Sequence, residues 1–253
     1  IGGFTILNSL LRTRKDVEVC YLADTKRVPY GNKNIDQIRS IAVEICDWFE
    51  NKNLDALLIA CNTTNACALD ILENNLKIPF FDLINSVSEV VTKKNIGLLA
   101  TPTTIRSSYY KKVIESKNEN VKLFQQECPE FVSEIEKTKL DFNKLNYLSD
   151  LYLNPLLNEN VEEIILGCSH YPLIYEVLKN KIHSSIKFID PSTALINKLN
   201  NSFFIPKDDW DNCIPHDNIN FFVTAKNLEF SKKVKYWLEI NKKIRLVNLR
   251  SNV

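Results

Sequence analysis

The stretch LLIACNTTNACALD, residues 57–70, joins an apolar run to a helix-like segment through a cysteine. The run at 55–60 predicts a buried β-strand, and the spacing of apolar residues over 64–76 predicts a helix. Nearly the same arrangement recurs in IILGCSHYPL, residues 164–173. Cys61 and Cys168 therefore each stand where a strand passes into a helix, which is the repeating step of an α/β fold.

The rest of the chain alternates in the same way. Continuous apolar strands alternating with helices predict a parallel sheet with both faces covered, and ligands of such sheets bind beyond the carboxyl ends of the strands. The opening IGGF predicts a glycine-rich turn. The expected strands are 17–23, 55–60, 78–84, 95–100, 121–126, 162–167, 186–190, 219–224 and 244–249. The expected helices are 34–50, 64–76, 86–94, 104–117, 131–158, 172–182, 193–203 and 226–240.

The spacing of the two cysteines is about the length of one small α/β domain. We therefore predict an α/β protein of two related, doubly wound parallel-sheet domains, with the active site between them. The first domain is expected over 1–87 and 193–253, and the second over 88–192.

Composition excludes several classes of function. A formal net charge of +1 over 253 residues gives no electrostatic reason to expect nucleic acid or a membrane surface as a partner. There is no apolar run of about 20 residues and no recognisable signal peptide. Seven irregularly spaced cysteines without a CxxC pair, and three scattered histidines, predict a reducing cytoplasm and no metal site. The cysteines expected to be structural are Cys20, Cys46, Cys67, Cys128 and Cys213.

The polar residues beside the two cysteines suggest chemistry. Asn62 and Thr63 follow Cys61, and Ser169 and His170 follow Cys168. A helix N-terminus favours an anion and lowers the pKa of a thiol from about 8.5 toward neutrality. A lone cysteine at a strand end is more often an inert buried residue. Two in the same setting favour function, either as a redox pair or as acid and base on opposite faces of one carbon, and their wide separation in sequence favours the second.

Five motifs in order carry a resemblance to a known family: IGGF (1–4), RVPYG (27–31), ACNT (60–63), CPEFVSEIE (128–136) and GCSHYPL (167–173). Together they resemble the glutamate racemases of the aspartate/glutamate racemase superfamily. The resemblance implies a cofactor-independent racemase in which Cys61 removes the α-proton of D-glutamate and Cys168 that of L-glutamate. It also implies a homodimer in a bacterial cytoplasm that supplies D-glutamate for peptidoglycan synthesis.

The resemblance implies roles for further residues. Tyr30, Gly31, Asn62, Thr63, Ser169 and His170 would contact the substrate, Thr101 and Thr104 would bind its carboxylates, and Glu136 would assist His170. Other interpretations stay open from the residues alone: VPYGN is also a plain turn, the two threonines suit helix capping, and a helical glutamate is commonly solvated.

Three departures from the family pattern bear on function. An Asp-Ser pair that usually precedes the glycine turn has no counterpart, and the chain has no methionine, so we expect the sequence to be incomplete at its N-terminus. Ser169 replaces a threonine and keeps its hydroxyl. FFDLINS (80–86) replaces a segment close to VIGVIEP. An aspartate racemase, or a racemase of another amino acid, therefore remains an alternative, and so does a catalytically inactive binding protein if the Asp-Ser pair is truly missing.

Overall fold

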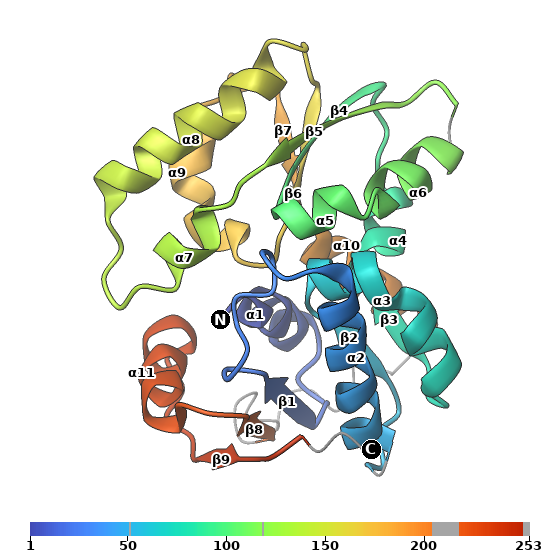
Figure 1. Ribbon diagram of the computed structural model, residues 1–253, viewed down its shortest axis with the longest axis vertical. Helices are drawn as coiled ribbons and strands as arrows, with labels where there is room; N and C mark the ends of the chain where they lie inside the picture. Colours follow the sequence, from blue (N-terminus) through green and yellow to red (C-terminus); the bar gives the residue numbers. More distant parts are fainter. Residues whose placement is uncertain (51, 118, 204–217, 250–253) are drawn as a thin grey trace.

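The computed structural model describes residues 1–50, 52–117, 119–203 and 218–249. Their strands form three sheets, of order β5-β4-β6-β7, β1-β8-β9 and β2-β3, and every strand pair is parallel. Helices cover these sheets on both faces (Figure 1). The predicted α/β class is confirmed.

The four-stranded sheet consists of β4 (Asn95–Ala100), β5 (Lys122–Glu127), β6 (Glu163–Gly167) and β7 (Lys187–Ile189). Ile164 and Leu166 of β6 pack into one core cluster, whereas Ile165 packs into another on the opposite face. This alternation buries every residue of β6. The first cluster holds α7 (Phe131–Ile135), α8 (Phe142–Leu157), the 3₁₀ helix η1 (Tyr171–Ile174) and α9 (Tyr175–Lys179). The second holds residues of α4 (Leu83–Ser88) and α6 (Tyr109–Lys117).

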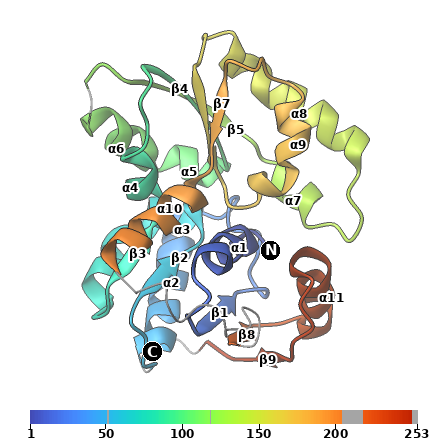
Figure 2. The ribbon, with the colours of Figure 1, turned by 180° about the vertical axis from the view of Figure 1, so that it is seen from behind.

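The remaining strands are β1 (Val19–Ala23), β8 (Ile219–Val223) and β9 (Ile244–Leu246) in one sheet, and β2 (Leu57–Ile59) and β3 (Phe80–Asp82) in another. Helix α1 (Gly3–Thr13) lies between two apolar clusters, because Phe4, Leu7 and Leu11 pack into one and Ile6 and Leu10 into the other. Around these strands lie α2 (Ile35–Glu50), α3 (Asn62–Asn75), α10 (Pro191–Ser202) and α11 (Asn227–Leu238) (Figure 2).

Several element boundaries differ from the prediction. IGGF is not a separate turn, because α1 begins at Gly3 with Gly2 in helical geometry before it. The helix expected over 104–117 is two helices, α5 (Pro102–Arg106) and α6, separated at Ser108, which has a φ of 57°. The stretch 131–158 is likewise divided between α7 and α8, where Asp141 caps the second helix through the backbone N–H of Lys144.

Strand order places the ends of β4 and β6 together. The chain passes from β4 outward to β5 and then returns to the other side of β4 as β6, so the order reverses between these two strands. Ala100 and Gly167, the last residues of the two strands, are register partners. The crevice beyond such a reversal is where α/β sheets bind ligands, and the residues that enter it are Thr101 and Cys168. No helix in the described part of the chain is long and apolar enough to cross a membrane.

Candidate active site

Cys61 lies two residues beyond β2 and is the residue before α3. Its extended backbone conformation ends the strand direction, and its carbonyl accepts hydrogen bonds from the backbone N–H and the side-chain Nδ2 of Asn65. The side chain is half-buried. Its sulfur does not cap the helix, and among the described residues no side chain is hydrogen-bonded to it.

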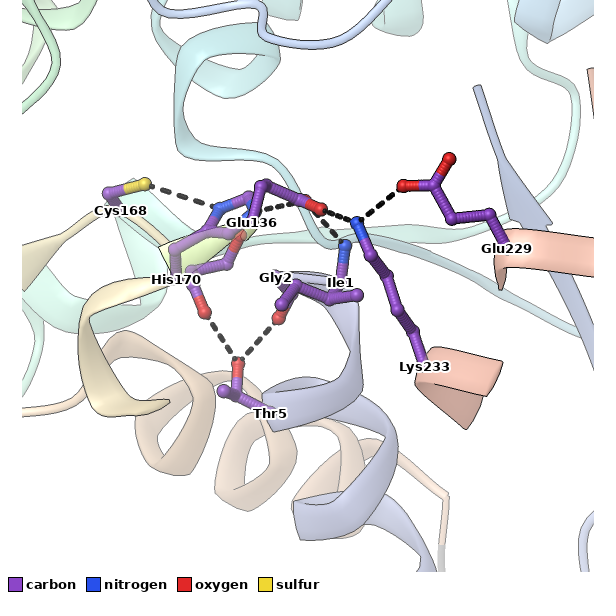
Figure 3. A network of polar contacts seen from close by, with 9 residues as sticks. Ile1, Gly2, Thr5, Glu136, Cys168, His170, Glu229 and Lys233 are labelled. Atoms are coloured by element: carbon purple, nitrogen blue, oxygen red, sulfur yellow. Dashed lines mark hydrogen bonds and ion pairs between the residues drawn. The ribbon is translucent and has the colours of Figure 1, made fainter. Parts of the chain in front are cut away.

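Cys168 follows β6 directly and is buried. Its Sγ lies 3.7 Å from Nδ1 of His170, and Nε2 of the same ring lies 2.8 Å from Oε1 of Glu136 (Figure 3). Because an ionised carboxylate only accepts, the hydrogen on Nε2 faces Glu136 and the lone pair of the neutral ring is left on Nδ1. His170 is therefore oriented to accept a proton from the thiol of Cys168.

Glu136 is held as an anion. Oε2 accepts from Nζ of Lys233 at 2.6 Å, and Oε1 accepts from Nε2 of His170 at 2.8 Å. Burial by itself raises the pKa of Glu136. Hydrogen bonds from His170 and Lys233 oppose this effect, and the pKa of this carboxyl lies well below its usual range.

The pKa of Cys168 corrects one expectation. The helix-terminal setting predicted a thiol with a pKa lowered toward neutrality, but burial raises the pKa of Cys168 to about 12. The backbone N–H of His170 opposes this rise, and a negative charge on Cys61 contributes to it. Cys168 stands at the predicted turn, but the loss of water around its sulfur has the largest influence on its pKa. Burial also lowers the pKa of His170 below its ordinary value of 6.5, which keeps the ring neutral and able to accept a proton.

Asn62 presents an unpaired donor. Its Oδ1 accepts from the hydroxyl of Tyr110 at 2.5 Å, whereas Nδ2 is buried and has no partner in the described part of the chain. The side chain is only 3% exposed and lines the same cavity as Cys61. An amide fixed through its oxygen in this way has its N–H groups free for a bound molecule.

Three threonine hydroxyls form a closed triangle. Oγ1 of Thr63 lies 3.1 Å from those of Thr101 and Thr104, which are 2.9 Å from each other. Thr101 precedes α5 but makes no side-chain cap, so the helix-capping interpretation does not hold for it. Thr63 and Thr101 line the cavity, whereas Thr104 is fully buried and is not among its lining residues. The structure therefore places Thr104 behind the other two hydroxyls.

Gly31 packs directly against this triangle. A Cβ added to Gly31 would lie 2.5 Å from Cβ of Thr101, so only glycine fits this close approach. The carbonyl of Gly31 accepts from the N–H of Thr103. Neighbouring Tyr30 donates its hydroxyl to Asp24 at 2.5 Å, and burial together with that carboxylate raises the pKa of the phenol. VPYGN is thus a turn that is fixed to the site at two points.

Ser169 and His170 approach the first residues of the chain. A Cβ on Gly2 would lie 2.4 Å from Oγ of Ser169 and 2.6 Å from Nδ1 of His170. Thr5 donates to the carbonyls of Gly2 and Ser169, which joins α1 to the turn after β6 (Figure 3).

One cavity of about 1260 Å³ collects these groups. The predicted site residues on its wall are Tyr30, Gly31, Cys61, Asn62, Thr63, Thr101, Glu136, Cys168, Ser169 and His170. They come from the carboxyl ends of β1, β2, β4 and β6 and from the end of α7. Among the described residues no group of three or more His, Cys, Asp or Glu side chains is arranged to hold a metal ion.

Comparison with known proteins identifies the family. Residues 6–199 match the family described as Asp/Glu/Hydantoin racemase. The chain belongs to this racemase family. A glutamate racemase of Prochlorococcus marinus (strain NATL1A) is 41% identical over 252 residues, which cover 99% of this chain and 94% of the relative.

Solved structures of the family agree with the fold. Glutamate racemase isoform RacE1 of Bacillus anthracis superposes with a TM-score of 0.89 at 27% identity, over 98% of this chain and 94% of the other. The glutamate racemase of Francisella tularensis, determined in complex with D-glutamate, gives a TM-score of 0.87 at 30% identity and the same coverage.

Asp24 and Lys233 also line the cavity and contact predicted site residues, but neither was predicted from the sequence. Asp24 follows β1 at its carboxyl end and binds Arg27, Tyr30 and Thr224. Its place after the strand VEVCYLA was a local signal that could have identified it. Lys233 lies on α11, far along the sequence, and no local pattern marks it. The six described cysteines are free, and Cys213 and His216 lie outside the described residues.

Proposed function

We propose that this chain is a cofactor-independent racemase that interconverts L- and D-glutamate with Cys61 and Cys168 as its two proton-transfer groups. The observation that carries the proposal is that both thiols line one cavity at the carboxyl ends of parallel strands, with His170 and Glu136 aligned behind one of them. The choice of glutamate rests on the relatives, which are named glutamate racemases.

In the L-to-D direction the Cys168 thiol first gives its proton to Nδ1 of His170, and the ionised Glu136 stabilises the imidazolium. The thiolate then removes the α-proton of L-glutamate, and the electron pair of the C–H bond passes to the α-carbon and its carboxylate. The Cys61 thiol delivers its proton to the opposite face, which yields D-glutamate and a Cys61 thiolate. In the reverse direction the two cysteines exchange roles.

The carbanion-like intermediate needs donors that are already in place, because no electron sink is involved. The free Nδ2 of Asn62 and the hydroxyls of Thr63, Thr101 and Ser169 line the cavity and supply them. Tyr30 and Gly31 close the wall beside Thr101. Thr104 contributes by orienting the other two threonine hydroxyls.

We also infer that the site lies between two domains, 1–87 with 193–253 and 88–192. The four-stranded sheet uses only strands from 95–189, and α10 packs with α1 and β3 in an apolar cluster of the first domain. A homodimer in a bacterial cytoplasm that supplies D-glutamate for peptidoglycan synthesis is the corresponding biological setting.

Circular dichroism of L- and D-glutamate incubated with the protein, without added cofactor, tests the proposal. Both enantiomers are expected to reach the racemic mixture. L- and D-aspartate, run in parallel, test the alternative substrate: a clear preference for aspartate would replace glutamate in the proposal. Failure with all four amino acids would favour the inactive binding protein.

A further inference from the structure

The carboxylate of Glu136 is fixed from both sides. Oε1 faces His170 Nε2 at 2.8 Å, and Oε2 faces Lys233 Nζ at 2.6 Å. Lys233 is on α11, which packs on the β1-β8-β9 sheet, whereas Glu136 follows α7, which packs on the four-stranded sheet. The lysine therefore extends from the part of the molecule that contains the β1-β8-β9 sheet to Glu136, which belongs to the part that contains the four-stranded sheet, as Figure 3 shows. We call the contacts Cys168–His170–Glu136 the relay.

We propose that Lys233 is a positioning residue for Cys168, because it holds Glu136 so that His170 stays aimed at the sulfur. This inference rests on the proposed function and assigns a role to a residue that contacts neither the thiol nor the imidazole.

The position of Lys233 is itself well defined. Phe230, three residues before Lys233, and Val234, the next residue, are buried in the core cluster of the β1-β8-β9 sheet. Glu229, one helical turn earlier, forms an ion pair with Nζ at 3.4 Å. The side chain of Lys233 is only 17% exposed. A charge-assisted bond between groups that are largely shielded from water is strong enough to select one orientation of a carboxylate.

Rotation of the carboxylate shows what the lysine contributes. If Lys233 is removed, Oε2 loses its partner, and the carboxylate can turn away from His170 without a compensating loss. Nε2–H then loses a fixed acceptor, and Nδ1 is no longer held 3.7 Å from the sulfur. The hydrogen bond and the charge of Glu136 raise the pKa of His170 by more than the charge of Lys233 lowers it, so release of the carboxylate lowers that pKa. The other charged and titratable groups around His170, Glu136 and Lys233 are Ile1, Tyr21, Cys168 and Glu229.

The test compares Lys233→Met with Lys233→Arg and with Lys235→Met, which removes an exposed lysine of the same helix. Lys233→Met is expected to lower kcat/KM about tenfold. It should also move the acid limb of the kcat/KM profile to lower pH, because His170 without the Glu136 contact is protonated only at lower pH. Lys233→Arg should restore most of kcat/KM and most of the position of the acid limb. Lys235→Met should match the unsubstituted protein in both measurements.

A second measurement does not depend on substrate. NMR titration of the histidines, with His170→Asn to identify the signal, should show a lower pKa for His170 in Lys233→Met, because His170 loses the contact with Glu136. If the protein racemises no amino acid but this shift is present, the proposed function fails and the positioning role stands. An unchanged His170 titration, or an equal shift in Lys235→Met, would overturn the inference.

Discussion

The two cysteines of the cavity occupy comparable places but very different surroundings. Each follows a parallel strand and precedes a helical turn. Cys168 is buried and is backed by His170, Glu136 and Lys233. Cys61 is half-buried, and in the described part of the chain its sulfur has no side-chain partner.

The difference follows from what a thiol needs to become a base. A buried thiol cannot lose its proton to water, so Cys168, whose pKa is raised to about 12, needs an adjacent acceptor. Cys61 is half-buried and lines the cavity. A negative charge on Cys61 also raises the pKa of Cys168, so a thiolate at Cys61 favours the thiol at Cys168.

The largest effect should come from removing either thiol. Cys61→Ser and Cys168→Ser are each expected to lower kcat/KM at least ~10³-fold, because a serine hydroxyl is a far weaker acid and base than a thiol. The interconverted enantiomers have an equilibrium constant of one, so kcat/KM stays equal in both directions for any variant, and the asymmetry must be measured as α-proton exchange in deuterated water.

In that exchange assay Cys168→Ser should retain exchange of D-glutamate, and Cys61→Ser should retain exchange of L-glutamate. Cys46→Ser, which removes a buried thiol outside the cavity, is the control. Undiminished racemisation by either cavity variant would remove the two-base proposal.

Removal of the relay should have the next largest effect. His170→Asn is expected to lower kcat/KM ~10²-fold, because Cys168 loses its proton acceptor. Exchange of the L-glutamate α-proton should fall much more than exchange of the D-glutamate α-proton. Equal losses of α-proton exchange for L- and D-glutamate would mean that His170 serves both thiols. The contrast between Cys61 and Cys168 would then not hold.

A smaller effect is expected on the Cys61 side of the cavity. Gly31→Ala places a Cβ 2.5 Å from that of Thr101, so the turn must shift and the threonine triangle with it. We expect kcat/KM to fall about tenfold and the unfolding free energy by about 1–3 kcal/mol. Gly97→Ala is the matched control, since its Cβ would meet only side-chain carbons of Ile164 and Leu156 at 3.1 Å at its closest contacts. Loss of activity in the control alone would contradict this assignment.

The same contrast explains which residues the sequence could reveal. Cys61 and Cys168 are found because a strand that ends at a polar turn is a local pattern. Asp24 has the same local signal but lacks a neighbour that suggests chemistry. Lys233 cannot be found in this way, because its function depends on a contact with Glu136 across 97 residues of sequence. The length of α1 was obscured by two glycines, although Phe4, Leu7 and Leu11 already follow helical spacing.

The smallest predicted effect is on stability in acid, and we consider the contribution of the Cys168 side. The pKa of His170 is lowered by folding from 6.5 and that of Glu136 from 4.5, so the unfolded chain binds more protons in both ranges. The free energy of unfolding should therefore fall as the pH drops below about 6.5, and fall further below about 4.5 as the ion pairs of Glu136 are lost. Urea unfolding at a series of pH values measures this. His170→Asn should lose the first decline and show a smaller second decline, because the hydrogen bond from His170 helps to lower the pKa of Glu136. A first decline of unchanged size in that variant would assign it to another group.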